Sequence, residues 1–213
     1  MTMGCADGYK KEAGRWVYVS WNEARGKRVD PVEGADEASF HILSDYYAAD
    51  RNAVYCGDEK IGQADPATFQ LMGGSYARDA KRVYFAAKEI PGADPATFKL
   101  LPRSCWGCDK TDVYIQRQPL HVRDISSFTL LQGVWAKDAK AYYVAPLLGS
   151  GIVPCDYASF VILSDGYAKD KNRGYWNGNP IAGSDGPTFQ ASSRNRAQDK
   201  NGCYIGWKKL PQK

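Results

Sequence analysis

The sequence predicts an all-β protein built from six tandem repeats of about 29 residues. The first observation is a phenylalanine that recurs at intervals of 29, 29, 30, 32 and 29 residues, at Phe40, Phe69, Phe98, Phe128, Phe160 and Phe189. The second is composition, because 14 Tyr and 6 Trp favour pleated strands while 21 Gly and 11 Pro indicate frequent turns. A fixed period of this length is typical of stacked repeat architectures. We therefore expect short strands, turns and single helical turns.

A short helical turn is expected at the start of each repeat. An aspartate stands four residues before each repeat phenylalanine, at Asp36, Asp65, Asp94, Asp124, Asp156 and Asp185. Its carboxylate can accept hydrogen bonds from the first N–H groups of a helical turn, and Pro95 after Asp94 has its φ already set. Phe98, with Leu100 and Leu101 after it, would then anchor the repeat in the core.

A β-hairpin is expected after each phenylalanine. Seven residues after it, four repeats carry an aromatic residue: Tyr47, Tyr76, Trp135 and Tyr167. Ten residues after it, five carry an aspartate: Asp50, Asp79, Asp138, Asp170 and Asp199. Fifteen residues after it stands a tyrosine, at Tyr55, Tyr84, Tyr143, Tyr175 and Tyr204, with Tyr114 shifted by one. Asp170-Lys171-Asn172 favours a turn and Asn177-Gly178 a tight hairpin. We expect these aspartates to hold turns and these aromatic residues to pack in the core.

The repeats are expected to share one core because none can fold alone. Burying one Phe or Leu contributes ~1.5–3 kcal/mol, while ordering the backbone costs ~1–2 kcal/mol per residue. We predict an N-terminal cap with half a repeat over residues 1–33, six repeats in one domain over 34–208, and a tail over 209–213. Arg196 replaces the first aromatic residue of the last repeat, as a water-facing end allows. The favoured arrangement is an open twisted array, and the alternative is a small closed β-propeller.

Two strings in the later repeats carry a family resemblance. Tyr167-Ala168-Lys169-Asp170-Lys171-Asn172 and Asp199-Lys200-Asn201, each followed by a tyrosine at the end of the next strand, resemble the DKNYY family. The resemblance covers roughly residues 34 to 206. It departs in the third repeat, where Cys105-Trp106-Gly107-Cys108 replaces the usual stretch and a remodelled turn is expected. It implies an exported protein of a bacterial envelope, often a lipoprotein, without enzymatic activity.

The N-terminal residues give some further indication of export. Gly4-Cys5 followed by a polar stretch is similar to the end of a lipoprotein cleavage box, so Cys5 is the expected lipidation site. Six cysteines also fit an oxidising compartment better than the cytosol. We therefore expect a periplasmic location, with contact to the membrane only through a lipid anchor. No apolar run approaches the roughly 18 residues of a spanning helix.

The pair Cys105 and Cys108 allows three interpretations. A structural disulfide in the remodelled turn is favoured, because the two residues are close in sequence. A redox-active pair has less support, since the β-α-β context that lowers a thiol pKa is missing. Zinc has less support still, because this pair supplies only two ligands and no second pair has metal spacing. We predict no metal and no cofactor.

No catalytic constellation is predicted. The two histidines, His41 and His121, belong to no pattern that would join a nucleophile to a base, and the chain has neither Gly-x-Ser-x-Gly nor a phosphate-binding glycine loop. A residue type that recurs in every repeat is expected to hold the turn of that repeat, whereas catalysis needs one special place. We therefore expect a protein that is not an enzyme.

The residues outside the repeat pattern are the candidates for binding a partner. The aromatic candidates are Trp16, Trp21, Trp106, Trp176 and Trp207, and the basic ones are Arg173, Arg194 and Arg196. The net charge of +4 is too small to indicate a nucleic-acid partner. The expected function is an immunity protein or inhibitor that occludes a secreted toxic effector such as a lipase or a wall hydrolase. The alternative is a glycan- or wall-binding module, in which sugar pockets would recur with the repeat.

Overall fold

The fold is a series of small antiparallel sheets, as predicted. The computed structural model describes residues 8–24, 26–145, 151–164, 166–193 and 195–211, and over these ranges it contains no α-helix. They form seven sheets, each built from consecutive strands, and none of the sheets is closed. The chain divides into two compact units, Met1–Cys105 and Trp106–Lys213.

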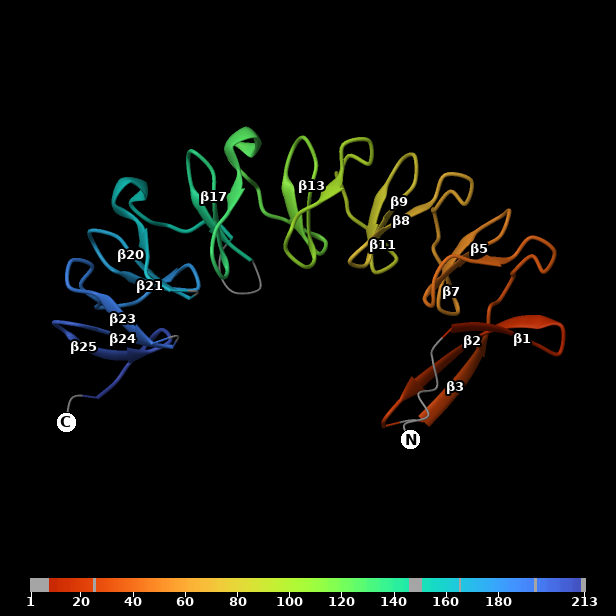
Figure 1. Ribbon diagram of the computed structural model, residues 1–213, viewed down its shortest axis with the longest axis horizontal. Coiled ribbons are helices and arrows are strands. Elements are labelled where there is room, and N and C mark those ends of the chain that lie inside the picture. The colour runs from red at the N-terminus through yellow and green to blue at the C-terminus, as the bar shows by residue number, and fades with distance from the viewer. Residues whose placement is uncertain (1–7, 25, 146–150, 165, 194, 212–213) are drawn as a thin grey trace. The chain divides into compact units, whose positions relative to one another are not determined.

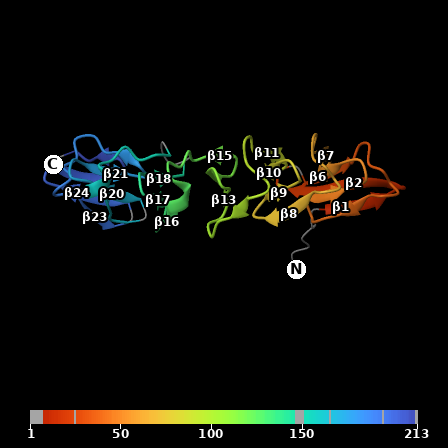
Figure 2. The same ribbon diagram turned by 90° about the horizontal axis from the view of Figure 1, so that it is seen from above.

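The first unit holds an N-terminal sheet, the sheets of the first two repeats and β12, the first strand of the third repeat's sheet (Figure 1). Its strands are β1 (Gly8–Glu12), β2 (Arg15–Asn22), β3 (Gly26–Pro31), β4 (His41–Ile42), β5 (Tyr47–Ala49), β6 (Val54–Cys56), β7 (Glu59–Lys60), β8 (Gln70–Gly73), β9 (Tyr76–Arg78), β10 (Val83–Phe85), β11 (Lys88–Glu89) and β12 (Lys99–Leu100). Neighbouring strands in each sheet are neighbours in sequence, as the order β11-β10-β9-β8 illustrates (Figure 2). Each repeat therefore completes its own sheet.

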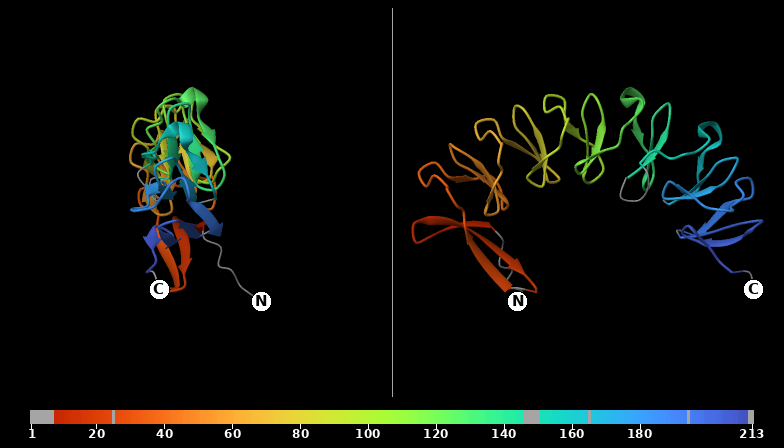
Figure 3. Two further views of the ribbon diagram at one scale, coloured as in Figure 1. Left: turned by 90° about the vertical axis from the view of Figure 1, so that its left-hand side faces the viewer. Right: turned by 180° about the vertical axis from the view of Figure 1, so that it is seen from behind.

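The second unit repeats this plan. Its strands are β13 (Trp106–Cys108), β14 (Val113–Ile115), β15 (Gln118–Pro119), β16 (Thr129–Leu130), β17 (Trp135–Lys137), β18 (Tyr142–Val144), β19 (Val161–Ile162), β20 (Tyr167–Lys169), β21 (Gly174–Trp176), β22 (Asn179–Pro180), β23 (Gln190–Ser193), β24 (Arg196–Asp199), β25 (Gly202–Ile205) and β26 (Lys208–Lys209). Two 3-10 helices, η1 (Ile125–Ser127) and η2 (Tyr157–Ser159), provide helical turns before β16 and β19. Figure 3 shows both as coils beside these strands.

An aspartate organises the turn between the two central strands of each repeat, and it is buried in the first five repeats and partly buried in the sixth. The Asp138 carboxylate accepts hydrogen bonds from the backbone N–H groups of Lys140 (2.6 Å) and Ala141 (2.7 Å) with one oxygen. Its other oxygen accepts the Tyr143 hydroxyl (2.5 Å) and the backbone N–H of Asp124 (2.8 Å). One carboxylate thus joins the turn, the closing strand and the start of the helical turn.

The same network recurs along the chain. We call Asp50, Asp79, Asp109, Asp138, Asp170 and Asp199 the turn aspartates, and each accepts the hydroxyl of the tyrosine five residues later. Asp109 was not expected, because it stands eleven residues after Phe98 rather than ten. The turn it holds, from Asp109 to Asp112, has the same backbone bond as the others (3.0 Å). The remodelling expected in the third repeat is therefore confined to the residues before β13, where Cys105 has a φ of 62°.

The first aspartate of each repeat caps the helical turn, as predicted. Asp124 accepts the backbone N–H of Ser126 (3.2 Å), and Asp156 accepts that of Ser159 (3.1 Å). Asp156 also forms an ion pair with Lys171 (2.8 Å). In this way the helical turn of a repeat is tied to the central turn of the same repeat.

Aromatic rings hold successive repeats together within each unit. In the second unit Phe160 packs against its own repeat's Tyr175 (5.4 Å between centroids) and against Trp135 of the preceding repeat (5.6 Å). The Trp135 indole N–H also donates to the main-chain oxygen of Ser164 (3.1 Å). The predicted core positions are therefore confirmed for the closing tyrosines, Trp135 and four of the six phenylalanines, while Phe69 and Phe128 are partly buried. Leu100 is a correction: it is 38% exposed, because it lies on a short strand rather than in the core.

Replacement of one turn aspartate should destabilise the protein severely. Asp138→Ala leaves two turn N–H groups, one further N–H and the Tyr143 hydroxyl without their acceptor in a buried site. We expect the free energy of unfolding to fall by about 3 kcal/mol or more. Urea unfolding followed by far-ultraviolet circular dichroism measures it. The exposed Asp45→Ala is the control and should change the value by less than ~0.5 kcal/mol. Equal effects of the two variants would contradict this role.

The turn aspartates also predict instability in acid. Burial raises the pKa of Asp138, but the hydrogen bonds from Tyr143, Lys140 and Asp124 outweigh burial and hold its pKa below the ordinary 3.8. A carboxyl with a depressed pKa in the folded state contributes stability above its unfolded pKa and loses it as the pH falls through the folded value. The urea midpoint should therefore stay constant from about pH 7 to 5 and fall below about pH 4. A midpoint unchanged at about pH 2 would refute the prediction.

Candidate partner-binding surface

The five candidate tryptophans lie in different environments. Trp106 is only 4% exposed, so its predicted role in binding is wrong. It begins β13 and pairs with Ile115, and thus occupies the buried position that Trp135 occupies at the start of β17. The third repeat has one extra residue before this strand, which hid the equivalence in the sequence.

Two candidates lie in the N-terminal sheet of the first unit. Trp16 stacks on Phe40 at 4.5 Å between centroids and an interplanar angle of 26°, so it mainly covers the first repeat. Trp21 lies near the end of β2 and is 49% exposed. Of these two, only Trp21 presents a large aromatic surface to solvent.

The last two repeats bring two tryptophans close together. The Trp176 ring packs on Tyr167 at 4.5 Å between centroids. Its indole also lies against Gly206, where an added Cβ would be 3.4 Å from the indole nitrogen. The next residue, Trp207, is 69% exposed at the tip of the hairpin between β25 and β26. The hairpin tip thus packs on the half-buried Trp176 through Gly206, and the adjacent Trp207 projects to solvent.

A basic and apolar sheet face adjoins this hairpin. Arg196 pairs with Ile205 across β24 and β25, and Ile205 pairs with Lys208 across β25 and β26. Ile205 is 39% exposed, whereas Val144, at the same repeat position, is buried under the following repeat's turn at Gly178. We call the exposed residues Arg196, Ile205, Trp207 and Lys208 the C-terminal surface.

The remaining predicted binding and lipidation residues are placed as follows. Arg173 is exposed in the turn after β20. Arg194 and Cys5 lie outside the residues that the structure describes, so their predicted roles stay predictions. The structure therefore brings together Trp176, Trp207 and Arg196 but separates them from the buried Trp106.

Both Cys105 and Cys108 are free thiols, so the predicted disulfide between them is not present. Cys105 precedes β13, and Cys108 is its last, buried residue. Three residue steps along an extended strand span about 10 Å, whereas a disulfide joins Cα atoms less than about 7 Å apart. The strand conformation of β13 thus explains why this pair is not bridged.

The titratable residues form no other candidate site within the described ranges. No group of three or more potential metal ligands is found among these residues. His41 is exposed in β4, and His121 lies 3.6 Å from Asp112. None of the helices in the described part of the chain has the length and apolar character needed to span a bilayer.

One apolar groove in the first unit was not expected from the sequence. It encloses about 560 Å³ and is lined by Tyr46, Tyr47, Leu71, Tyr76 and smaller side chains of the first two repeats. Tyr46 is 54% exposed at its rim. The signal in the sequence is an aliphatic residue two positions after the phenylalanine, at Ile42, Leu71 and Leu100, each partly exposed.

The thiols should differ in reactivity according to their burial. Cys203 is exposed, Cys108 is buried, and burial raises the pKa of Cys155 to about 12. Because the thiolate is the reactive form, iodoacetamide at about pH 8 should modify Cys203 first. Cys108 and Cys155 should react only after unfolding, as peptide mass spectrometry can show. Recovery of a peptide with Cys105 bridged to Cys108, or equal labelling rates for all three thiols, would contradict these assignments.

Comparison with known proteins identifies the repeats. The model of the DKNYY family matches residues 12–75 and 76–208, which together cover most of the chain. The searches of curated proteins and of solved structures returned no match. The matched ranges include the central strands and turn aspartates of every repeat. The chain therefore belongs to the DKNYY family.

Proposed function

We propose that this protein is a non-enzymatic envelope protein that binds another protein and blocks it, as an immunity protein blocks a toxic effector enzyme in the periplasm. The observation that carries the proposal is the C-terminal surface, where Trp207, Ile205 and Arg196 are exposed together. Tryptophan and arginine are enriched among the residues that dominate protein interfaces. An aromatic and aliphatic centre with a basic edge suits an acidic patch on a partner.

The internal hydrogen bonds of the repeats also favour binding over catalysis. The turn aspartates accept up to four hydrogen bonds each, as Asp138 does from two turn residues, Tyr143 and Asp124. The closing tyrosines donate their hydroxyl groups to these carboxylates. Because these residues are used to stabilise the fold, we expect the exposed side chains outside the repeat pattern to carry the function.

A sugar-binding module has less support than a protein-binding one. Sugar rings stack on exposed aromatic faces, and a module of this type would present one in each repeat. The recurring aromatics, including Tyr84, Trp135 and Tyr175, are buried. The most exposed tryptophans, Trp21 and Trp207, do not recur with the repeat.

The proposed location rests on the family and on the N-terminal sequence. The DKNYY resemblance implies an envelope protein, and Gly4-Cys5 is similar to a lipoprotein box. An inhibitor must be in the same compartment as the effector that it blocks. The two proposals, envelope location and inhibition of a secreted enzyme, therefore fit together.

Trp207 should dominate the affinity for the partner. A pull-down from the source cell's lysate with the tagged chain, read by mass spectrometry, should recover one stoichiometric protein. Trp207→Ala should raise the Kd for that protein at least about tenfold, as expected of a hot-spot residue. Trp21→Ala is the matched control, since it removes another exposed tryptophan from the first unit, and should change the Kd less than about twofold.

Circular dichroism of both variants must match that of the unaltered chain. An unchanged Kd for Trp207→Ala would overturn the proposed surface. Recovery of no protein, with retention of the chain on purified wall material, would overturn the inhibitor function in favour of glycan binding.

A further inference from the structure

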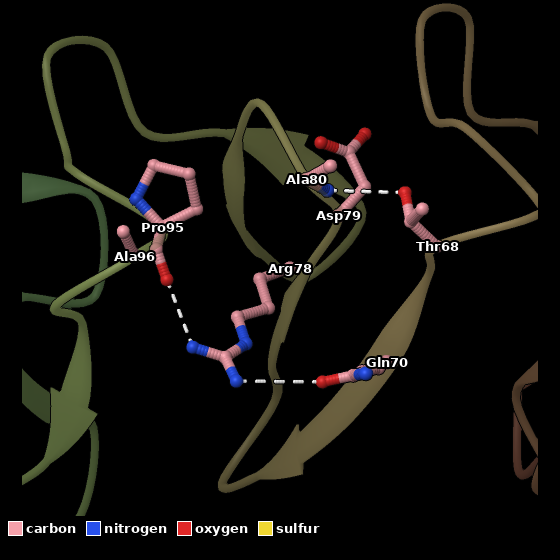
Figure 4. Close-up of a pocket in the computed structure, with 7 residues that line it drawn as sticks. All are labelled: Thr68, Gln70, Arg78, Asp79, Ala80, Pro95 and Ala96. Carbon is pink, nitrogen blue, oxygen red and sulfur yellow. Dashed lines mark hydrogen bonds between the residues drawn. The ribbon is translucent and has the colours of Figure 1, made fainter.

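A polar groove lies between the second repeat and the following helical turn of the first unit (Figure 4). It encloses about 330 Å³, and its walls are Thr68, Gln70, Arg78, Asp79, Ala80, Pro95 and Ala96. Figure 4 shows Arg78 extending along one side, where its guanidinium donates to the main-chain oxygen of Pro95 (2.8 Å) and to the side-chain oxygen of Gln70 (3.4 Å). The groove therefore has a fixed cation at its edge.

The same groove exists one repeat earlier. A space of about 370 Å³ is lined by Ser39, His41, Asp50, Arg51, Pro66 and Ala67. Each of these residues stands 29 positions before a lining residue of the groove at Pro95. The groove is thus a property of the repeat, formed where the central turn of one repeat faces the helical turn of the next.

In the second unit a side chain of the protein itself fills the equivalent place. Tyr157 stands three residues before Phe160, as Pro95 stands three residues before Phe98. The Tyr157 hydroxyl reaches back and donates to the main-chain oxygen of Asp138 (2.8 Å), which is the counterpart of Asp79. A tyrosine ring with its hydroxyl directed at this carbonyl is therefore compatible with this place in the repeat.

The last junction shows a third form of the same position. Gly186 stands three residues before Phe189, and a Cβ added there would lie 2.1 Å from the main-chain oxygen of Asp170. The backbone itself covers the carbonyl at this junction. At these four junctions the state of the groove goes with the residue at this position: it is open at Pro66 and Pro95, occupied by Tyr157, and closed at Gly186.

We propose that the two open grooves, at Pro66 and Pro95, each receive a tyrosine side chain of the partner protein. The phenol would donate to the main-chain oxygen of Asp50 or Asp79, as Tyr157 does to that of Asp138. In the second groove the ring would also lie near the Arg78 guanidinium, which favours an aromatic face. This inference rests on the proposed function only in taking the partner to be a protein.

A small tyrosine analogue tests the grooves without the partner. N-acetyl-L-tyrosinamide, titrated into the ¹⁵N-labelled full chain, should shift the amide signals of Thr68, Ala80 and Ala96 in nitrogen–proton correlation spectra. Their counterparts Ser39, Arg51 and Ala67 should shift as well. We expect saturation with a Kd on the order of millimolar, as suits so small a ligand. N-acetyl-L-phenylalaninamide, which lacks the donor, should bind several-fold more weakly.

Two variants exploit the natural differences between repeats. Pro95→Tyr should fill the second groove and abolish the shifts at Ala80, while the shifts at Arg51 in the first groove persist as an internal control. Tyr157→Ala should open the groove of the second unit and produce new shifts at Ser127 and Ala139. Circular dichroism must show that both variants are folded.

The outcomes separate this inference from the proposed function. Absence of saturable shifts in the unaltered chain, equal binding of the phenylalanine analogue, or shifts at Ala80 that survive Pro95→Tyr would each overturn the tyrosine grooves. The recovery of a protein partner and its dependence on Trp207 are measured independently. A failed titration together with a successful pull-down would therefore reject tyrosine binding in the grooves but not the proposed function.

Discussion

The carboxylate of the turn aspartate is the interaction on which the repeat depends. It satisfies two N–H groups of a tight turn, one N–H at the start of the helical turn, and the hydroxyl of the closing tyrosine, as Asp138 illustrates. Each repeat has strands of only two to four residues, which supply few backbone hydrogen bonds and little apolar area. A buried charge is stable only when its hydrogen bonds are complete. The carboxylate and the segments around it must therefore form together.

The sequence predicted the parts of the fold that are defined by local chemistry. Capping by Asp124 and Asp156, the turn at Asp170 and the burial of Tyr175 all follow from residue type and spacing, and all are present. Two of the errors, at Trp106 and Asp109, come from one inserted residue in the third repeat. The insertion displaces Trp106 and Asp109 by one residue relative to the other repeats, as it does Tyr114. With this displacement taken into account, Trp106 is the core aromatic residue of the third repeat and Asp109 is its turn aspartate.

Exposure was harder to predict than element type. Trp176 and Trp207 are both outside the repeat pattern, yet one packs on Tyr167 and the other projects from a hairpin tip. Exposure of Ile205 depends on the absence of a covering turn such as the one at Gly178, which protects Val144. Such differences arise from the stacking of neighbours, which a repeat alignment does not contain. The sequence could therefore indicate which residue types contribute to the binding surface, but not which of these residues are exposed.

Five of the six turn aspartates, all except Asp109, accept a hydrogen bond from a backbone N–H that lies 14 residues earlier in the same repeat, so each of these carboxylate networks stays within one repeat. Neighbours meet mainly through rings, such as Phe160 against Trp135, and through single hydrogen bonds. A duplication or loss of one whole 29-residue segment would preserve every such carboxylate site and recreate the same ring contact at the new junction. The length of the array can therefore change in evolution by unequal recombination, while a shift of even one residue inside a repeat has to be absorbed locally, as it is before β13.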